Sequence, residues 1–149
     1  MKTKPIFPPT YFFVSIATMA LFHFLMPVFI IARYPWNLLG IIPLVTGVFL
    51  NLKADAAFKK VQTTVKPFER SKALVTTGVF RASRHPMYLG MVLILLGIAI
   101  LMGSLAPFFV IAIFGTLIEL VFVRTEERML DEKFGAAWVA YKKKVRKWI

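Results

Sequence analysis

The chain is 149 residues long, which is room for one domain. It is 58% hydrophobic, with a mean hydropathy of +0.72, yet it carries a net charge of +12. An apolar body with basic ends predicts an integral membrane protein. A soluble nucleic-acid-binding protein would also be basic, but it would lack several uncharged runs of membrane length.

Residue types that bind metals are scarce. The chain has no cysteine, which excludes disulfides, thiolate metal sites and a cysteine nucleophile. His23 and His85 are its only histidines, so we expect no histidine-rich metal centre.

The first predicted transmembrane helix covers about residues 11–32, because prolines precede it and it contains no Asp, Glu, Lys or Arg. It is too long for a cleaved signal peptide, and it ends at Arg33 rather than at a small-residue cleavage site. Pro27 is expected to kink this helix. His23 could face the bundle as a functional group, or it could be a neutral histidine bonded to a neighbouring helix.

The second predicted span covers about residues 36–52. Gly40 and Gly47 are seven positions apart and therefore share one helix face, where they permit close approach of a neighbouring backbone. Gly90 and Gly97 repeat this spacing in the third span.

The third and fourth spans, about residues 87–103 and 105–123, are joined by a very short turn and are predicted to pack antiparallel. Pro86 suits the first position of the third helix, where its missing N–H costs little. Ser83 is the expected N-cap.

A charged tail, residues 124–149, follows the fourth span. Strong helix formers predict that the helix continues out of the membrane and stops at Gly135. Residues 136–144 then predict a short amphipathic helix with Trp138 and Tyr141 on one side. The basic, aromatic end of the chain is suited to lie on a membrane surface.

Four spans place the loop 53–86 and the tail 124–149 on the same side of the membrane. The segment 53–84 and the tail each hold eight basic residues, whereas the turn between the first two spans holds only Arg33. The positive-inside rule therefore predicts cytoplasmic termini, in the inner membrane if the protein is bacterial. The expected fold is an all-α membrane bundle of about four transmembrane helices with a cytoplasmic C-terminal helical extension.

Candidate functional residues gather at the predicted cytoplasmic ends of the third and fourth spans. Arg84 and His85 begin the third span, and Glu126 and Glu127 follow the fourth. Because the two spans form a hairpin, these groups should lie at the same depth. Glu119 is seven positions before Glu126 and shares its helix face.

Basic residues of the tail, Arg146 and Lys147, can fold back toward this cluster. A polar cluster of both signs beside an apolar bundle would suit a ligand with a charged head and a lipid-like partner. Alternatively, the glutamates merely pair with Arg84, Arg128 or Arg146 and fix the tail, since ion-pair networks resemble sites. The chain contains no dinucleotide-binding glycine motif after a strand, no P-loop and no Gly-x-Ser-x-Gly motif.

One spaced motif runs through about residues 78–149. It consists of Arg84-His85-Pro86-Met87-Tyr88-Leu89-Gly90, an apolar hairpin, Glu126-Glu127, Phe134-Gly135, Trp138, Tyr141 and Val145-Arg146. This motif resembles the superfamily of isoprenylcysteine carboxyl methyltransferases and phospholipid methyltransferases. The resemblance implies an integral membrane enzyme that uses S-adenosylmethionine in a cytoplasmic-side pocket. A lipophilic or prenylated substrate would enter from the bilayer between helices.

The resemblance also implies site residues. The cofactor-binding positions are His85, Tyr88, Leu89, Gly90, Glu126, Glu127 and Tyr141. Leu89 and Gly90 would lie against the nucleoside, and Tyr141 and Arg146 would close the pocket. The acceptor decides the catalytic group. A carboxylate needs a cation such as Arg84 or Arg146, and an amine needs a carboxylate such as Glu119 or Glu126 to accept a proton.

The sequence is also compatible with two other classes of function. One is an NADPH-dependent membrane reductase of sterol-reductase-like architecture, whose nucleotide would need additional basic contacts. The other is a non-enzymatic membrane protein whose tail binds anionic lipid. No nucleic-acid partner and no metal site are expected.

Overall fold

The computed structural model describes residues 7–26, 29–62 and 72–149, and these ranges are helical without strands. The elements are α1 (Pro8–Leu25), the 3₁₀ segment η1 (Trp36–Gly40), α2 (Ile41–Lys60), the 3₁₀ segment η2 (Gly78–Arg81), α3 (Pro86–Met102), α4 (Ala106–Leu117), the π-helical segment η3 (Ile118–Val123), α5 (Arg124–Phe134) and α6 (Ala136–Lys144). The predicted fold class is confirmed.

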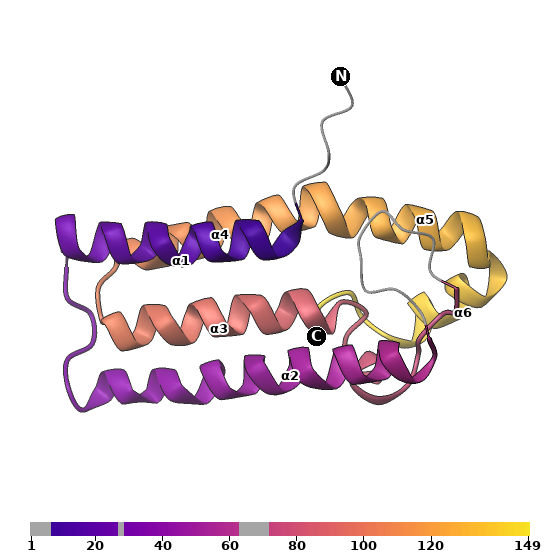
Figure 1. Ribbon diagram of the computed structural model, residues 1–149, viewed down its shortest axis with the longest axis horizontal. Coiled ribbons are helices and arrows are strands. Elements are labelled where there is room, and N and C mark those ends of the chain that lie inside the picture. The colour runs from indigo at the N-terminus through magenta and orange to yellow at the C-terminus, as the bar shows by residue number, and fades with distance from the viewer. Residues whose placement is uncertain (1–6, 27–28, 63–71) are drawn as a thin grey trace, which may run out of the picture.

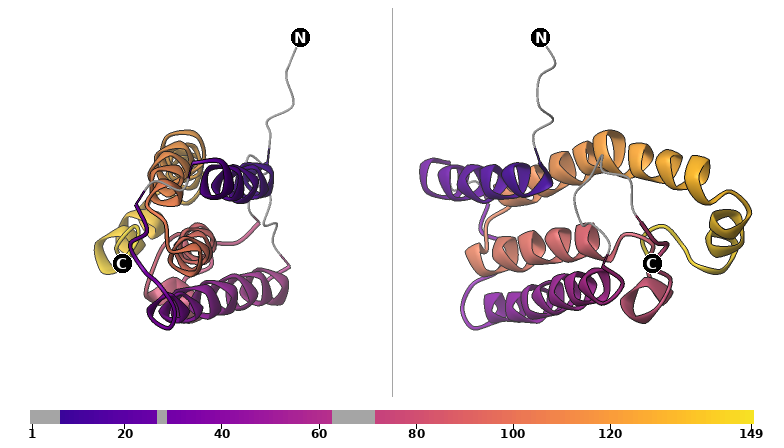
Figure 2. Two further views of the ribbon diagram at one scale, coloured as in Figure 1. Left: turned by 90° about the vertical axis from the view of Figure 1, so that its left-hand side faces the viewer. Right: turned by 45° about the vertical axis from the view of Figure 1, so that its right-hand side comes forward.

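Helix α3 lies at the centre of the bundle. Figure 1 shows α1 and α4 side by side in one layer, α3 below them and α2 on the opposite side, and the end-on view of Figure 2 agrees. Leu95 and Ala99 of α3 are fully buried against Phe114 and Ile118 of the α4–η3 helix. The core is therefore organised around α3.

Three described helices are long and apolar enough to cross a membrane: Pro8–Leu25, Trp36–Lys60 and the continuous helix Ala106–Phe134. The fourth, α3, is apolar and 17 residues long, which is at the lower limit for a span. Many large apolar side chains face outward, among them Phe24, which is 77% exposed. Such an outer surface is stable where lipid is the solvent.

The two glycine pairs predicted to allow close approach contact each other in an antiparallel seam between α2 and α3. A Cβ added at Gly40 would lie 2.4 Å from the Gly97 carbonyl oxygen, and one added at Gly47 would lie 2.4 Å from the Gly90 oxygen. No residue larger than glycine fits at these crossings without separating the helices, so the seam fixes the position of α3.

The bounds of the first span differ from the prediction. Helix α1 begins at Pro8, because proline is compatible with the first turn of a helix, and it ends at Leu25. Ile31 and Ala32 are not helical: their N–H groups donate to the Gly103 carbonyl, 2.7 and 3.2 Å away. The expected kink at Pro27 lies outside the described residues.

His23 contacts a neighbouring element. Its Nδ1 lies 2.7 Å from the hydroxyl of the fully buried Ser104, in the turn between α3 and α4. This contact agrees with the structural alternative for His23, a histidine bonded to a neighbour, and it ties the end of α1 to that turn.

The charged tail follows the prediction closely. The α4–η3–α5 helix runs on without a break to Phe134, and Gly135, with a φ of +47°, ends it. Helix α6 packs back with Trp138 and Tyr141 buried on one side. The Tyr141 hydroxyl donates to the Phe80 carbonyl at 2.6 Å, so α6 is held against the segment that leads into α3.

Candidate functional site

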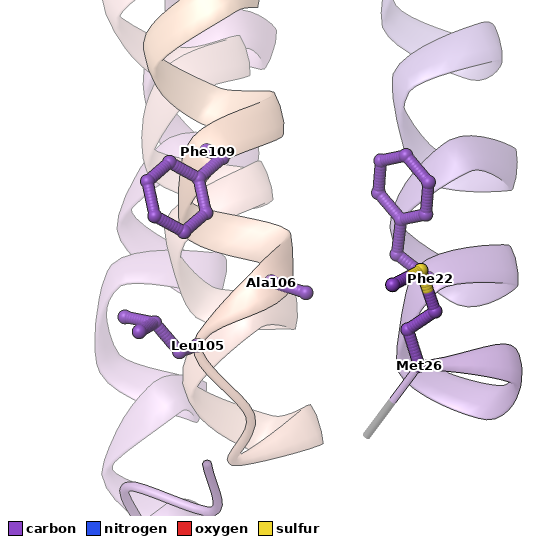
Figure 3. Close-up of a pocket in the computed structure, with 5 residues that line it drawn as sticks. All are labelled: Phe22, Met26, Leu105, Ala106 and Phe109. Carbon is purple, nitrogen blue, oxygen red and sulfur yellow. The ribbon is translucent and has the colours of Figure 1, made fainter. Parts of the chain in front are cut away.

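An apolar recess and a polar cluster occupy opposite ends of the bundle. The recess, of about 220 Å³, lies between α1 and α4 near the α3–α4 turn and is lined by Phe22, Met26, Leu105, Ala106 and Phe109 (Figure 3). It offers only hydrocarbon contacts. Ion-paired side chains gather at the other end, where α3 begins and α5 leaves the bundle (Figure 1).

His85 is the residue that precedes the first turn of α3, because Pro86 fixes the start of the helix. The N-cap position is therefore His85, and the prediction that Ser83 is the N-cap is wrong by two residues. Ser83 has another role: its hydroxyl accepts a hydrogen bond from the His85 N–H at 3.2 Å. Ser83 and His85 are both buried.

The imidazole of His85 lies between the two carboxylates of the first turn of α5. Its Nδ1 is 3.6 Å from Glu126 Oε2, and its Nε2 is 3.3 Å from Glu127 Oε1. Only 4% of the side chain is exposed. Nε2 is therefore within hydrogen-bond distance of Glu127, and Nδ1 faces Glu126 at ion-pair distance, so the two carboxylates favour the imidazolium form.

These contacts shift two pKa values in opposite directions. Burial opposes the charged form of His85, but its hydrogen bonds to Glu126 and Glu127 and their negative charges raise the His85 pKa above 6.5. For Glu127, burial acts upward, but the hydrogen bond from His85 and the charges of Arg84, His85 and Lys147 lower the pKa below 4.5.

Two further side chains hold the acidic pair. Arg84 Nη2 lies 2.9 Å from Glu127 Oε1, and the guanidinium stacks 5.6 Å from the Trp138 ring of α6. The Tyr88 hydroxyl, one turn into α3, donates to Glu126 Oε1. The motif at the start of α3 and the acidic pair thus form one connected network, as the hairpin topology predicted.

Glu119 joins the network through the tail. It lies in the π-helical segment η3, and such segments often occur at functional positions. Its Oε1 accepts from Lys147 Nζ at 2.8 Å, while Arg124 Nε lies 3.9 Å away. Lys147 Nζ is also 3.7 Å from Glu127 Oε2.

Three buried polar atoms of this region have no hydrogen-bond partner among the residues that the structure describes: Arg84 Nε, Trp138 Nε1 and Glu119 Oε2. Two are donors and one is a carboxylate oxygen. Buried polar groups normally find partners. Because two donors and one acceptor here can still form hydrogen bonds, this region can bind a polar ligand that carries both positive and negative groups.

The remaining predicted residues take different positions. Leu89 is half-buried, and Gly90 faces α2, where an added Cβ would lie 2.7 Å from the Gly47 oxygen. Tyr141 supports the site from α6, and burial raises its pKa to about 12. The Arg146 side chain is exposed, although its carbonyl accepts from the Arg84 N–H at 3.1 Å.

Sequence reasoning did not assign roles to Ser83, Trp138 and Trp148 in this site. The Trp148 ring lies 6.5 Å from the His85 ring, and Trp138 stacks on Arg84. Their signal in the sequence is weak: Ser83 and Trp148 each adjoin one basic residue, and Trp138 stands between an alanine and a valine. Of the two basic residues predicted to fold back, Lys147 rather than Arg146 supplies the side-chain cation.

We expect stability in detergent to depend on pH through His85 and Glu127. The raised pKa of His85 contributes stability below pH 6.5 that is lost as the pH rises through the folded-state value. The lowered pKa of Glu127 contributes above pH 4.5 and is lost in stronger acid. The melting temperature should therefore be highest between about pH 4.5 and pH 6.5, and it should fall in stronger acid and at alkaline pH.

Melting curves from about pH 4 to pH 9 test this prediction. His85→Gln should remove most of the fall on the alkaline side. His23→Gln, which changes the chain's other histidine, should keep it. An equal alkaline fall in the two variants would contradict the assignment to His85.

Membrane-length helices around a buried core define an integral membrane protein, and a network of ionic side chains of both signs lies at one end of its bundle. Residues 36–137 match the phospholipid methyltransferase family, and this match covers more than half of the chain. The chain therefore belongs to the phospholipid methyltransferase family, whose members are membrane methyltransferases acting on lipid-type substrates.

A relative from Haemophilus influenzae, described as an uncharacterized protein, is 36% identical over 63 residues. The aligned part is 42% of this chain and 100% of the relative. No solved structure matches the chain.

Proposed function

We propose that the protein transfers a methyl group from S-adenosylmethionine to an amine-bearing lipophilic substrate taken from the membrane. Family membership supports methyl transfer to a lipid-type substrate. The observation that carries the choice of an amine is the buried Oε2 of Glu119, which has no hydrogen-bond partner in the described part of the chain.

The residues present fit the chemistry of S-adenosylmethionine, which carries an ammonium, a carboxylate, a sulfonium and an adenosine. Glu126 and Glu127 supply acceptors for the ammonium or the ribose hydroxyls. The unpaired N–H groups of Arg84 and Trp138 are donors suited to the carboxylate. The aromatic ring of Trp148, near His85, is suited to the adenine or the sulfonium.

When bound, the cofactor supplies an activated methyl group whose leaving group is a neutral thioether. The chain's own residues then align the acceptor and manage its proton. An amine is protonated at neutral pH and must lose one proton before its lone pair can attack. Glu119 Oε2 can accept that proton.

A carboxylate acceptor fits less well. It needs a cation near the reacting oxygens, but Arg84 is paired with Glu127 at 2.9 Å and its remaining N–H is assigned to the cofactor's carboxylate, and the Arg146 side chain is exposed. The free oxygen of Glu119 would repel a carboxylate. An NADPH phosphate would meet the same repulsion from Glu119, Glu126 and Glu127, so the reductase alternative is disfavoured.

We propose that the site faces the cytoplasm, since eight basic residues lie in the tail and only Arg33 in the turn between the first two spans. The chain has no cysteine, so single cysteines can report sidedness. A membrane-impermeant maleimide added to intact cells should label Arg33→Cys and spare Lys144→Cys. The reverse labelling would overturn the orientation.

Methyl transfer in liposomes tests the proposed function. Purified protein is given S-adenosylmethionine with a labelled methyl group and lipids that carry either a primary amine or a carboxylate headgroup. We expect label in the amine lipid. Absence of both cofactor binding and labelled lipid would refute the proposal, and label confined to the carboxylate lipid would refute the amine assignment.

Glu119→Gln refines this test. The substitution removes the proton acceptor and should lower turnover by about 10²–10⁴-fold, the usual contribution of general-base catalysis. Asp131→Asn is the matched control, because Asp131 pairs with Lys142 on the exposed side of α5. Full turnover in Glu119→Gln would exclude Glu119 as the base.

A further inference from the structure

The last segment of the chain, residues 145–149, lies across the polar network. The Arg84 N–H donates to the Arg146 carbonyl at 3.1 Å, and the Ser83 hydroxyl donates to the Lys147 carbonyl at 3.2 Å. Val145 is buried and anchors the segment. These contacts bring the Lys147 side chain over the carboxylates from the end of the chain.

The Lys147 ammonium lies between two carboxylates that belong to different parts of the long helix. It is 2.8 Å from Glu119 Oε1 in η3 and 3.7 Å from Glu127 Oε2 in α5. The side chain is 32% exposed. Lys147 therefore bridges the proposed proton acceptor and the proposed cofactor-binding pair.

The network is already balanced in charge. Its three carboxylates, Glu119, Glu126 and Glu127, meet three cationic groups, Arg84, His85 and Lys147. Arg124, which is 65% exposed, adds further positive charge 3.9 Å from Glu119. S-adenosylmethionine carries two positive groups and one negative group. A partly buried site that is already neutral accepts an additional positive charge only at a cost in desolvation and repulsion.

Among the three cationic groups, Lys147 is the one most easily displaced. Its side chain is 32% exposed, against 10% for Arg84 and 4% for His85. Its ammonium is also the same chemical group as the amino group of the cofactor. Arg84 is additionally held by stacking on Trp138.

We propose that Lys147 is a tethered counter-cation that occupies the acidic site and is displaced by the positively charged head of the cofactor. The inference rests on the proposed function, because it concerns the same site and the same cofactor. Lys147 keeps Glu119 and Glu127 paired when the cofactor is absent. It also makes the site selective, since each bound cation must replace the ammonium.

The variant Lys147→Met tests the inference, because methionine keeps the length and the apolar stem but removes the charge. Two measurements are made on the full-length protein in detergent: the melting temperature without ligand, and the dissociation constants for S-adenosylmethionine and S-adenosylhomocysteine. The second ligand lacks the sulfonium charge. Lys147→Arg preserves the charge, and Lys144→Met removes an exposed charge from α6 as a matched control.

We expect opposite signs in the two measurements. Lys147→Met should melt at a lower temperature than the unaltered protein, because Glu119 and Glu127 lose a counter-ion. It should nevertheless bind S-adenosylmethionine about two- to five-fold more tightly, the range that a partly exposed ion pair is worth. The gain should be smaller for S-adenosylhomocysteine, and neither Lys147→Arg nor Lys144→Met should show it.

Weaker binding of S-adenosylmethionine by Lys147→Met would overturn the inference, because Lys147 would then stabilise the bound cofactor. Unchanged binding would also overturn it, because Lys147 would then not compete with the cofactor. An unchanged melting temperature would also overturn it, since the ammonium would not occupy the acidic site in solution. Failure of the unaltered protein to bind either ligand would instead refute the proposed function.

Discussion

Glu127→Gln should weaken binding of S-adenosylmethionine by about 100-fold, because this carboxylate joins three cations and each hydrogen bond to a charged group is worth roughly 1.5–3 kcal/mol. Glu127 Oε1 lies 2.9 Å from Arg84 Nη2 and 3.3 Å from His85 Nε2, and Lys147 Nζ lies 3.7 Å from Oε2. Glutamine keeps the shape but turns one acceptor into a donor that faces these cations. Calorimetric titration of the variant in detergent measures the change.

The same substitution should lower the free energy of unfolding by roughly 1–3 kcal/mol, because the Arg84 side chain, only 10% exposed, loses its counter-ion. His85→Ala should weaken cofactor binding in the same direction. Glu132→Gln is the matched control, since Glu132 lies on the same helix and pairs with Arg128 in solvent. Equal cofactor affinity in Glu127→Gln and Glu132→Gln would remove Glu127 from the site, and Arg33→Ala, at the other end, should change neither property.

Gly47→Ala should destabilise the protein by roughly 1–3 kcal/mol, as expected when a core is overpacked. Its added Cβ would lie 2.4 Å from the Gly90 oxygen and 2.9 Å from the Ile94 nitrogen, so backbone atoms of α3 must move. Because α3 carries Tyr88 and follows His85, cofactor affinity should fall together with stability. Unfolding in a denaturing detergent and cofactor titration measure the two effects.

Gly115→Ala in α4 is the control with the opposite sign. An added Cβ there meets no heavy atom within 4 Å, so alanine should stabilise the helix by about 0.5–1 kcal/mol through its greater helix propensity. If the two substitutions had the same effect, the α2–α3 seam would not depend on close backbone contact.

The Gly47–Gly90 contact gives Gly90 a packing role beside the cofactor-binding role that the resemblance implies, which stays a prediction. The sequence placed Gly90 in a motif whose resemblance implied contact with the cofactor's nucleoside, where glycine allows close approach. In the structure, the side of Gly90 where a Cβ would project faces α2. A seven-residue glycine repeat on two helices is visible in the sequence, but the partner of each repeat depends on how the helices pack.

In the tail, too, the sequence predicts the elements but not which side chains contact each other. Composition predicted a charged helical extension with a break at Gly135 and an inner face of Trp138 and Tyr141, and each of these features is confirmed. The choice between Arg146 and Lys147 was beyond composition, because both are cations at the chain end. It depends on the direction in which the segment crosses the start of α3, which is set by backbone hydrogen bonds to Arg84 and Ser83.

The sequence by itself determined the membrane class, the helical fold, the charged end of the bundle and the hairpin that brings Arg84 and His85 to Glu126 and Glu127. These follow from hydropathy, charge and short-range spacing, which are local properties of the chain. Only the tertiary structure decided that His85 lies between the two carboxylates, that one Glu119 oxygen has no hydrogen-bond partner among the described residues, and that Lys147 contacts Glu119 and Glu127. Those contacts join residues distant in the sequence through side-chain geometry, which no periodicity encodes.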